Sequence, residues 1–183
     1  MCLNGRSGRP WDVPNFQQGN LLDRVLKHSQ FSSLFSQVCC LGNNHVLDWS
    51  QPGLLETLDA LHGAGIQTAG AGRNAAEAEW PAVVAVPQAQ PSGRILVWAV
   101  GNESSGVPFT WAATHSRPGV FYVDLSEGDA EHLGSLIAAE KQPGDVAVVS
   151  VHWGSNWGFP VPRSQQQFAH VLIDKGELCA LLP

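Results

Sequence analysis

Residues 146–158 read VAVVSVHWGSNWG, and this stretch decides the fold class. Its first six residues are apolar or small and mostly β-branched, which is typical of a short strand buried inside a sheet. The strand ends at His152, and a glycine-containing loop with Trp153 and Trp157 follows. A strand of this kind indicates an α/β sheet with helices packed on it.

Segments with strand character and segments with helix character alternate along the rest of the chain. Strands are predicted over residues 38–41, 66–71, 82–86, 95–100, 120–123 and 146–151. Helices are predicted over residues 53–62, after Asn74 as a capping residue, over residues 127–141 with Ser126 as the residue that starts the helix, and after Ser164 as a capping residue. This alternation predicts an α/β fold, either a single sheet or a layered α/β sandwich.

Size and charge exclude several classes of partner. A chain of 183 residues with 44% hydrophobic residues is large and apolar enough for one globular domain. Its net charge is −6 and its 10 lysines and arginines are scattered, which argues against nucleic acid or an anionic membrane as partner. No apolar run approaches the roughly 20 residues of a membrane span, and no signal peptide is visible. As written, the sequence predicts a cytoplasmic chain.

The first chemically suggestive motif is LGNNHVLDWS at residues 41–50. The side-chain oxygen of Asn43 or Asn44 is able to bind a divalent cation, and His45 is able to protonate a leaving group. Asp48, three residues further on, could orient that histidine. A simpler interpretation is that the two asparagines only form a turn before the helix.

The second motif surrounds His152 at the end of the buried strand. A histidine that leaves a strand for a glycine-containing loop is well placed to bind a metal, or to serve as a hydrogen-bonded residue at the edge of the core. Trp153 and Trp157 are able to stack on a ring or amide of a substrate, although such residues more often pack. Asn156, between the two tryptophans, is a further polar candidate.

Three segments together resemble the CapA-type poly-γ-glutamate capsule synthesis proteins, which belong to the calcineurin-like metallophosphoesterase superfamily. The segments are NNHVLDWSQPGLLETLDALHGAGIQTAGAGRNAAEAEWPAV at residues 43–83, RPGV at 117–120 and KQPGDVAVVSVHWGSNWGFPVPRSQQQFAHVLIDKG at 141–176. The resemblance covers about residues 38–176, and the combination of motifs is specific where no single motif is.

The resemblance implies a four-layer α/β/β/α sandwich with a two-metal site at the strand ends. Asn44 and His152 would be metal ligands, and His45 would protonate the leaving oxygen. The cofactors would be divalent ions such as Mn, Fe or Zn, and the substrate an anionic polymer or a phosphoester-like compound. Asn43, Asp48, Asn156 and Trp157 are further candidates for the site.

The two ends of the chain depart from the family pattern. Residues 1–37 lack the expected strand with a Gly-Asp ligand motif, and no HGHxxH-like motif follows residue 176. We therefore expect a divergent N-terminal segment over 1–37 and an incomplete CapA-like domain over 38–183, truncated at both ends. Two neutral ligands without a carboxylate are expected to bind metal weakly, so catalysis is expected to be impaired.

Two other functions remain open from the sequence. The chain could be a non-catalytic fragment or a partner-binding module, which the missing ligand motifs favour. It could also be an unrelated α/β hydrolase, although no G-x-S-x-G nucleophile motif occurs.

Overall fold

The computed structural model describes residues 37–86, 93–155, 157, 160–176 and 180–182. In chain order its elements are β1 (Val38–Cys40), α2 (Ser50–Gly63), β2 (Gln67–Ala69), β3 (Ala71–Gly72), α3 (Ala75–Glu79), β4 (Ala82–Val86), β5 (Gly93–Gly101), η1 (Glu103–Ser105), η2 (Phe109–Trp111), β6 (Gly119–Val120), α4 (Glu127–Glu140), β7 (Val146–His152), α5 (Arg163–Gly176) and β8 (Ala180–Leu182). Among the helices in these ranges, none is both long and apolar enough to cross a bilayer.

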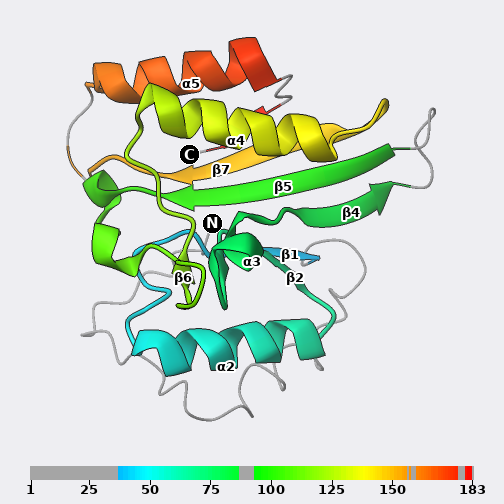
Figure 1. Ribbon diagram of the computed structural model, residues 1–183, viewed down its shortest axis with the longest axis vertical. Coiled ribbons are helices and arrows are strands. Elements are labelled where there is room, and N and C mark those ends of the chain that lie inside the picture. The colour runs from blue at the N-terminus through cyan, green and yellow to red at the C-terminus, as the bar shows by residue number, and fades with distance from the viewer. Residues whose placement is uncertain (1–36, 87–92, 156, 158–159, 177–179, 183) are drawn as a thin grey trace, which may run out of the picture.

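The elements stack in four layers, α/β/β/α (Figure 1). Helix α2 forms one outer layer and covers the β1–β2 pair, whose strands run parallel. The second sheet has the order β4-β5-β7-β8, and α4 with α5 covers its other face. In that sheet β5, β7 and β8 are parallel and β4 is antiparallel to β5. A short β3–β6 pair completes the described strands. The predicted α/β sandwich is confirmed.

Strand β7 has two faces with different roles. Ala147, Val149 and Val151 are buried in one cluster with the inner faces of α4 and α5. The residues between them point to the opposite face, because side chains alternate along a strand. Ser150 and His152 therefore face the β1–β2 sheet.

The main apolar core lies between the larger sheet and helices α4 and α5. Its largest members are fully buried: Trp98 and Leu96 from β5, Leu133 and Ile137 from α4, and Phe168 and Leu172 from α5. Each such side chain contributes about 1.5–3 kcal/mol of transfer free energy. A second cluster packs Leu54, Leu58 and Leu61 of α2, which recur at helical spacing, against Leu41 and Ile66.

The two sheets meet through very small side chains. Ala69 and Ala99 face one another across the interface together with Ala82. Gly70 has a φ of +88°, and a Cβ built on it would lie 2.6 Å from the carbonyl oxygen of Ala99. This glycine also interrupts the predicted strand 66–71, which is divided into β2 and β3.

Several local predictions have clear outcomes. Asn74 and Ser126 are confirmed as N-caps, because their side-chain oxygens accept hydrogen bonds from the backbone N–H of Glu77 (3.0 Å) and Asp129 (3.1 Å). The capping role of Ser164 is wrong, because α5 begins one residue earlier, at Arg163. Strand β8 was not predicted. The predicted strand 120–123 is reduced to the two-residue β6, since residues 121–123 bond to Gly70 and Gly101 outside a regular ladder.

A partly buried ion pair joins the starts of β5 and β7 to the end of α4. The guanidinium of Arg94 donates to the carboxylate of Asp145 (2.6 Å) and to the carbonyl oxygen of Glu140 (2.9 Å). The backbone N–H groups of Arg94 (2.8 Å) and Gln142 (2.9 Å) donate to the same carboxylate. These bonds, with Arg94 foremost, lower the pKa of Asp145 to about 2. Asp145 therefore does more than shape a turn.

We expect Gly70→Ala to lower the free energy of unfolding by about 2–4 kcal/mol, from left-handed strain and the clash with Ala99. Gly63→Ala is the matched control, because nothing lies within 4 Å of its added Cβ. This second variant should be unchanged or up to about 1 kcal/mol more stable. Urea denaturation of both variants measures the difference, and equal effects would contradict the close contact between the sheets.

We expect acid to weaken the fold through Asp145. Its folded-state pKa of about 2 lies below the ordinary 3.8, so ionised Asp145 stabilises the folded state above pH of about 4. That contribution is lost as the pH falls through about 2. Asp145→Asn should lower the urea midpoint at neutral pH and flatten its decrease in acid. The control is Asp59→Asn, whose carboxylate is 73% exposed and should matter little.

Candidate functional site

Asn44 and His152 lie in contact although 108 positions separate them in the sequence. Oδ1 of Asn44 is 3.2 Å from Nε2 of His152. His152 is the last residue of β7, on the face turned toward β1 and β2. The chain leaves β1 through Gly42, whose Cβ, if present, would lie 3.0 Å from the backbone of Val100. Because Gly42 allows this approach, the loop that carries Asn44 reaches the end of β7.

The two asparagines of the motif have different roles. Oδ1 of Asn43 accepts a hydrogen bond from the backbone N–H of His45 at 2.9 Å, which forms an Asx turn. Asn43 is therefore a turn residue, in agreement with the simpler interpretation of this motif. Asn44 instead directs its amide at His152.

His45 lies on the surface beside its expected carboxylate partner. Its side chain is 78% exposed, and its Nδ1 is 2.9 Å from Oδ2 of Asp48. A carboxylate at Nδ1 favours the tautomer that carries the proton there, and leaves Nε2 free to exchange a proton with a bound molecule. The orientation of His45 by Asp48 is thus in place, whereas its catalytic role stays a prediction.

The surroundings of His152 favour the neutral form of its imidazole. Burial lowers the pKa of His152 below its ordinary value of 6.5, and the charge of nearby His45 lowers it further. The neutral form is the one that binds a metal ion through a ring nitrogen. The same shift also suits a simple hydrogen bond to Asn44, so it does not distinguish the two roles.

The loop after β5 supports this site and was not singled out from the sequence. The backbone N–H of Asn102 (3.1 Å) and the hydroxyl of Ser105 (2.6 Å) both lie within hydrogen-bond distance of the carbonyl oxygen of His152. Oγ of Ser104 accepts from the N–H of Gly154. On the other side, a Cβ at Gly106 would lie 3.3 Å from the amide nitrogen of Asn44.

Asn102 keeps that loop in shape. It is buried, and its Nδ2 donates to the carbonyl oxygen of Val123 at 2.7 Å. Its Oδ1 accepts from the backbone N–H of Ser104 at 2.9 Å. The sequence pattern Asn-x-Ser at residues 102–104 is a signal for such an Asx turn, but it does not reveal the contact with His152.

Of the two tryptophans predicted near the site, one packs against a helix and the other lies exposed on the surface. Trp153 meets Phe168 edge to face, with ring centroids 6.1 Å apart, and so packs on α5. Trp157 is 88% exposed. Asn156 lies outside the described residues.

The Asn44–His152 pair supplies part of a metal site. A separation of 3.2 Å is suitable for two neighbouring donors on one ion whose ligand bonds measure about 2.1 Å. Within the described ranges, however, no group of three or more His, Cys, Asp and Glu side chains could hold a metal. The donors seen here are both neutral and do not complete a ligand set, so metal binding stays a prediction.

The comparison with protein families settles the ancestry of the chain. A family model described as "Bacterial capsule synthesis protein PGA_cap" matches residues 3–178. The chain belongs to this family. The resemblance to CapA-type proteins is confirmed. The match includes most of residues 1–37, and the expectation that they form a divergent N-terminal segment stays a prediction.

Curated proteins give the same result. This PGA_cap family member is 46% identical over 147 residues to a "probable polyglutamine synthesis accessory protein" of Mycobacterium tuberculosis, found in two strains. That alignment covers 79% of this chain and 38% of the relative. It is also 27% identical over 153 residues to the "PGA biosynthesis protein CapA" of Bacillus subtilis strain 168, covering 84% of this chain and 36% of the relative. The chain thus spans less than two fifths of the length of these relatives.

We expect Asn102→Ala to lower the free energy of unfolding by about 1–3 kcal/mol, because the buried carbonyl of Val123 and the partly buried N–H of Ser104 lose their partner. The same change should shift the imidazole nitrogen resonances of His152 in nuclear magnetic resonance spectra. Asn74→Ala is the matched control, since it removes an equivalent cap from α3, at a cost of about 1 kcal/mol. If the His152 resonances are unmoved in Asn102→Ala, the loop does not position that residue.

Proposed function

We propose that this chain is the part of an accessory protein of poly-glutamate synthesis that carries a hydrolytic centre formed by Asn44, His45 and His152. The observation that supports this proposal is the contact between Asn44 and His152, which joins two motifs 108 positions apart. The names of the relatives support the biological setting. An anionic polymer or a phosphoester-like compound is the proposed substrate.

The proposed chemistry uses a divalent ion such as Mn, Fe or Zn, which Asn44 and His152 would help to hold. When bound, such an ion polarises an oxygen of the substrate and lowers the pKa of a water molecule. The residues of the chain position the ligands and supply the proton donor. Burial favours the neutral form of His152, whose backbone is held by Asn102 and Ser105.

His45 is the proposed proton donor to the leaving oxygen. It is exposed, so a substrate is able to reach its ring. Asp48 holds Nδ1 of the ring at 2.9 Å and fixes its orientation. A proton on Nε2 would then be the one transferred.

A second function is a non-catalytic one, in which the chain binds a partner of the synthesis machinery. Large aromatic side chains are exposed close to both motifs in the sequence: Trp49 is 54% exposed and Trp157 is 88% exposed. Exposed tryptophans are frequent anchors in protein interfaces. The incomplete set of donors among the described residues also favours this alternative.

Metal analysis of the purified full chain separates the two functions. We expect bound divalent metal in the parent chain, its loss in Asn44→Ala and His152→Ala, and its retention in His45→Ala. Hydrolysis of an aryl phosphate ester should fall about 10²–10⁴-fold in His45→Ala, which removes only the proton donor.

His170→Ala is the matched control, because it removes an exposed histidine from α5. It should change neither metal content nor activity. Absence of metal from the parent chain, or metal retained in His152→Ala, would contradict the metal-dependent centre and favour the partner-binding function.

A further inference from the structure

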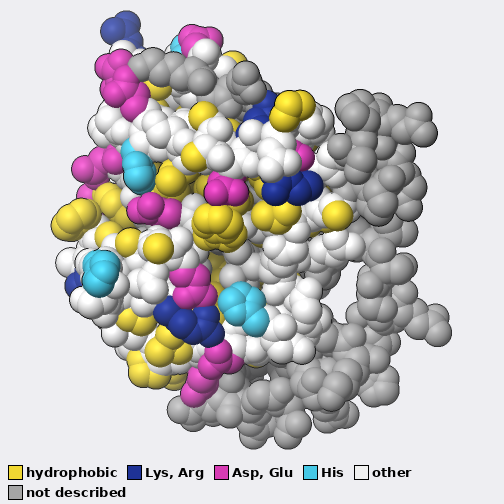
Figure 2. Space-filling model, turned by 45° about the vertical axis from the view of Figure 1, so that its right-hand side comes forward, with side chains coloured by type: hydrophobic (Ala, Val, Ile, Leu, Met, Phe, Trp, Pro, Cys, Tyr) yellow, Lys and Arg dark blue, Asp and Glu magenta, His cyan; other side chains and the backbone are white. Residues whose placement is uncertain are grey.

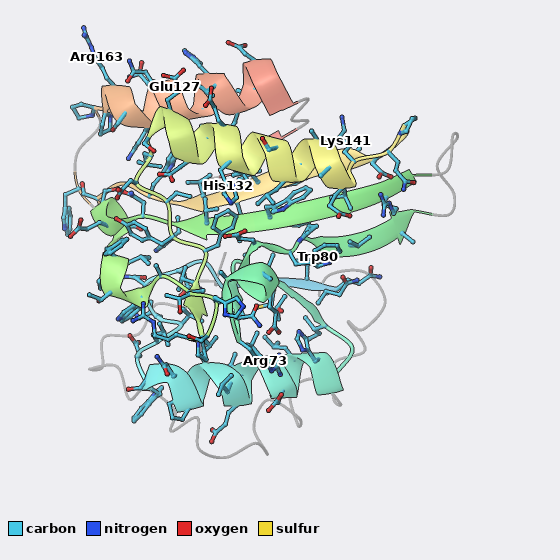
Figure 3. The ribbon with its side chains drawn as sticks, viewed as in Figure 1. Arg73, Trp80, Glu127, His132, Lys141 and Arg163 are labelled. Atoms are coloured by element: carbon cyan, nitrogen blue, oxygen red, sulfur yellow. The ribbon has the colours of Figure 1, made fainter. Side chains whose placement is uncertain are left out.

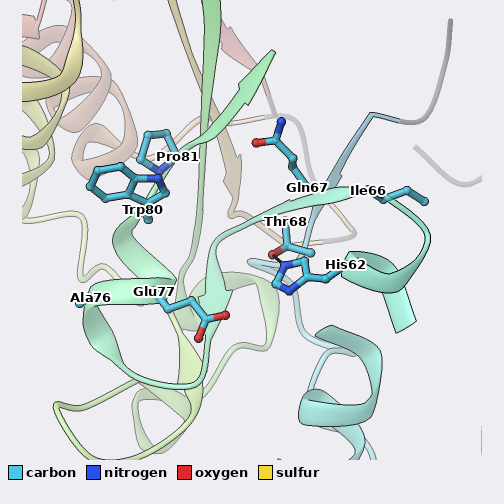
Figure 4. A pocket seen from close by; sticks show the side chains of 9 residues that line it. His62, Ile66, Gln67, Thr68, Ala76, Glu77, Trp80 and Pro81 are labelled. Carbon is cyan, nitrogen blue, oxygen red and sulfur yellow. Dashed lines mark hydrogen bonds between the residues drawn. The ribbon is translucent and has the colours of Figure 1, made fainter. Parts of the chain in front are cut away.

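A pocket lies at the far end of α2 from the candidate site. It has a volume of about 590 Å³, which is in the range of small-molecule sites. His62, Ile66, Thr68, Glu77, Trp80 and Pro81 form most of its lining. Figure 2 shows this face, where histidine, acidic, basic and hydrophobic side chains gather around a hollow. Figure 4 shows the side chains from close by.

The pocket is separate from the Asn44–His152 site. Helix α2 has 14 residues, so its two ends are about 20 Å apart. His45 precedes the first turn of this helix, whereas His62 lies in its last turn. A ligand in the pocket would therefore not touch the candidate site.

One wall of the pocket is an aromatic surface. Trp80 follows α3 and is 56% exposed, with Pro81 beside it (Figure 4). Figure 3 labels Trp80 beside α3, and Arg73 between α3 and α2. An indole that is half exposed inside a concavity offers a flat apolar face to a bound molecule.

The opposite wall and the base carry hydrogen-bonding groups. Nε2 of His62 is 3.0 Å from Oγ1 of Thr68, and Figure 4 shows both side chains facing the side of Glu77. Glu77 itself accepts hydrogen bonds from the backbone N–H of Arg73 (2.8 Å) and from its guanidinium. An imidazole and a hydroxyl group both donate and accept hydrogen bonds and a carboxylate accepts them, so together these groups are able to bind several hydroxyl groups.

The walls are preformed. The side-chain amide of Gln67 bonds to both backbone groups of Val83, accepting from its N–H at 2.7 Å and donating to its carbonyl oxygen. Arg73 also bonds to Asp59 on α2, which links α2 to α3. A ligand would therefore not have to order these side chains on binding.

Charge limits the class of ligand. The guanidinium of Arg73 is shared by Glu77 and Asp59, so the lining has no free cation among the described residues to bind an anionic group. The charge of Glu77 is in turn offset by Arg73, which weakens its attraction for an ammonium group. A neutral ligand with an apolar face and several hydroxyl groups suits both facts.

We propose that this pocket binds a neutral sugar ring, stacked on Trp80 and hydrogen-bonded to His62, Thr68 and Glu77. This site is independent of the hydrolytic centre proposed above. It would give the chain a carbohydrate-binding function in addition to any role in poly-glutamate synthesis.

Titration of the ¹⁵N-labelled full chain with N-acetylglucosamine and with methyl β-glucopyranoside tests the proposal. We expect a saturable shift of the Trp80 indole resonance at millimolar sugar concentrations. Thr68→Val should weaken binding several-fold, and Trp80→Ala should weaken it at least about tenfold. Trp49→Ala is the matched control, since this indole is exposed to a similar extent but lies outside the pocket, and it should leave the affinity unchanged.

Three results would overturn the proposal. The first is the absence of any saturable shift at Trp80 in a chain whose other resonances show the folded state. The second is an equal, non-saturating shift of Trp80 and Trp49, which means non-specific contact. The third is a saturable shift with tetramethylammonium or with oligo-γ-glutamate and none with either sugar, which assigns the pocket to a charged ligand.

Discussion

The close contact between the two sheets is the constraint on which the rest of the structure depends. Ordinary sheets pack about 10 Å apart because side chains fill the space between them. Here alanines form the interface, and glycines stand where a Cβ would strike the opposite backbone. The backbone of Gly70 fits against Ala99 only without a side chain and in a left-handed conformation. Larger residues at these positions would push the sheets apart, and the loop after β1 would move away from β7.

That constraint produces the contact between Asn44 and His152. Asn44 lies in the turn after β1 and His152 is the last residue of β7, and these two strands belong to different sheets. A third segment also stabilises the contact, because the loop at 102–106 bonds to the backbone of His152 and lies against Asn44. The turn after β1, the end of β7 and the loop at 102–106 thus together determine the distance between Asn44 and His152. In such an arrangement the chemical groups are oriented by backbone hydrogen bonds, which are less mobile than long side chains.

The sequence predicted most of the helices and strands and pointed to both residues of the Asn44–His152 contact, but it did not reveal the details that depend on tertiary structure. Strand β7 and helix α4 follow from local apolar patterns that hold in the folded chain. The family motifs led to Asn44 and His152, because each motif contains one residue of a pair that comes into contact only in the folded chain. The role of Asn102 was not visible, since its partner carbonyl at Val123 is 21 positions away and any residue type carries one. The role of Asp145 was not visible either, because its partner, Arg94, is 51 positions away. The pocket beside Trp80 combines three separate elements, and no single segment indicates it.

The amide of Gln67 has a consequence for how the protein meets other chains. Strand β4 pairs with β5 on one side only among the described residues, which leaves an open edge. Near the start of that edge, both backbone groups of Val83 are already bonded to Gln67. The amide of Gln67 thereby makes the two hydrogen bonds that a residue of a neighbouring strand would make. An incoming β-strand would have to displace this amide before it could extend the sheet at β4, so the bond protects the protein from edge-to-edge aggregation.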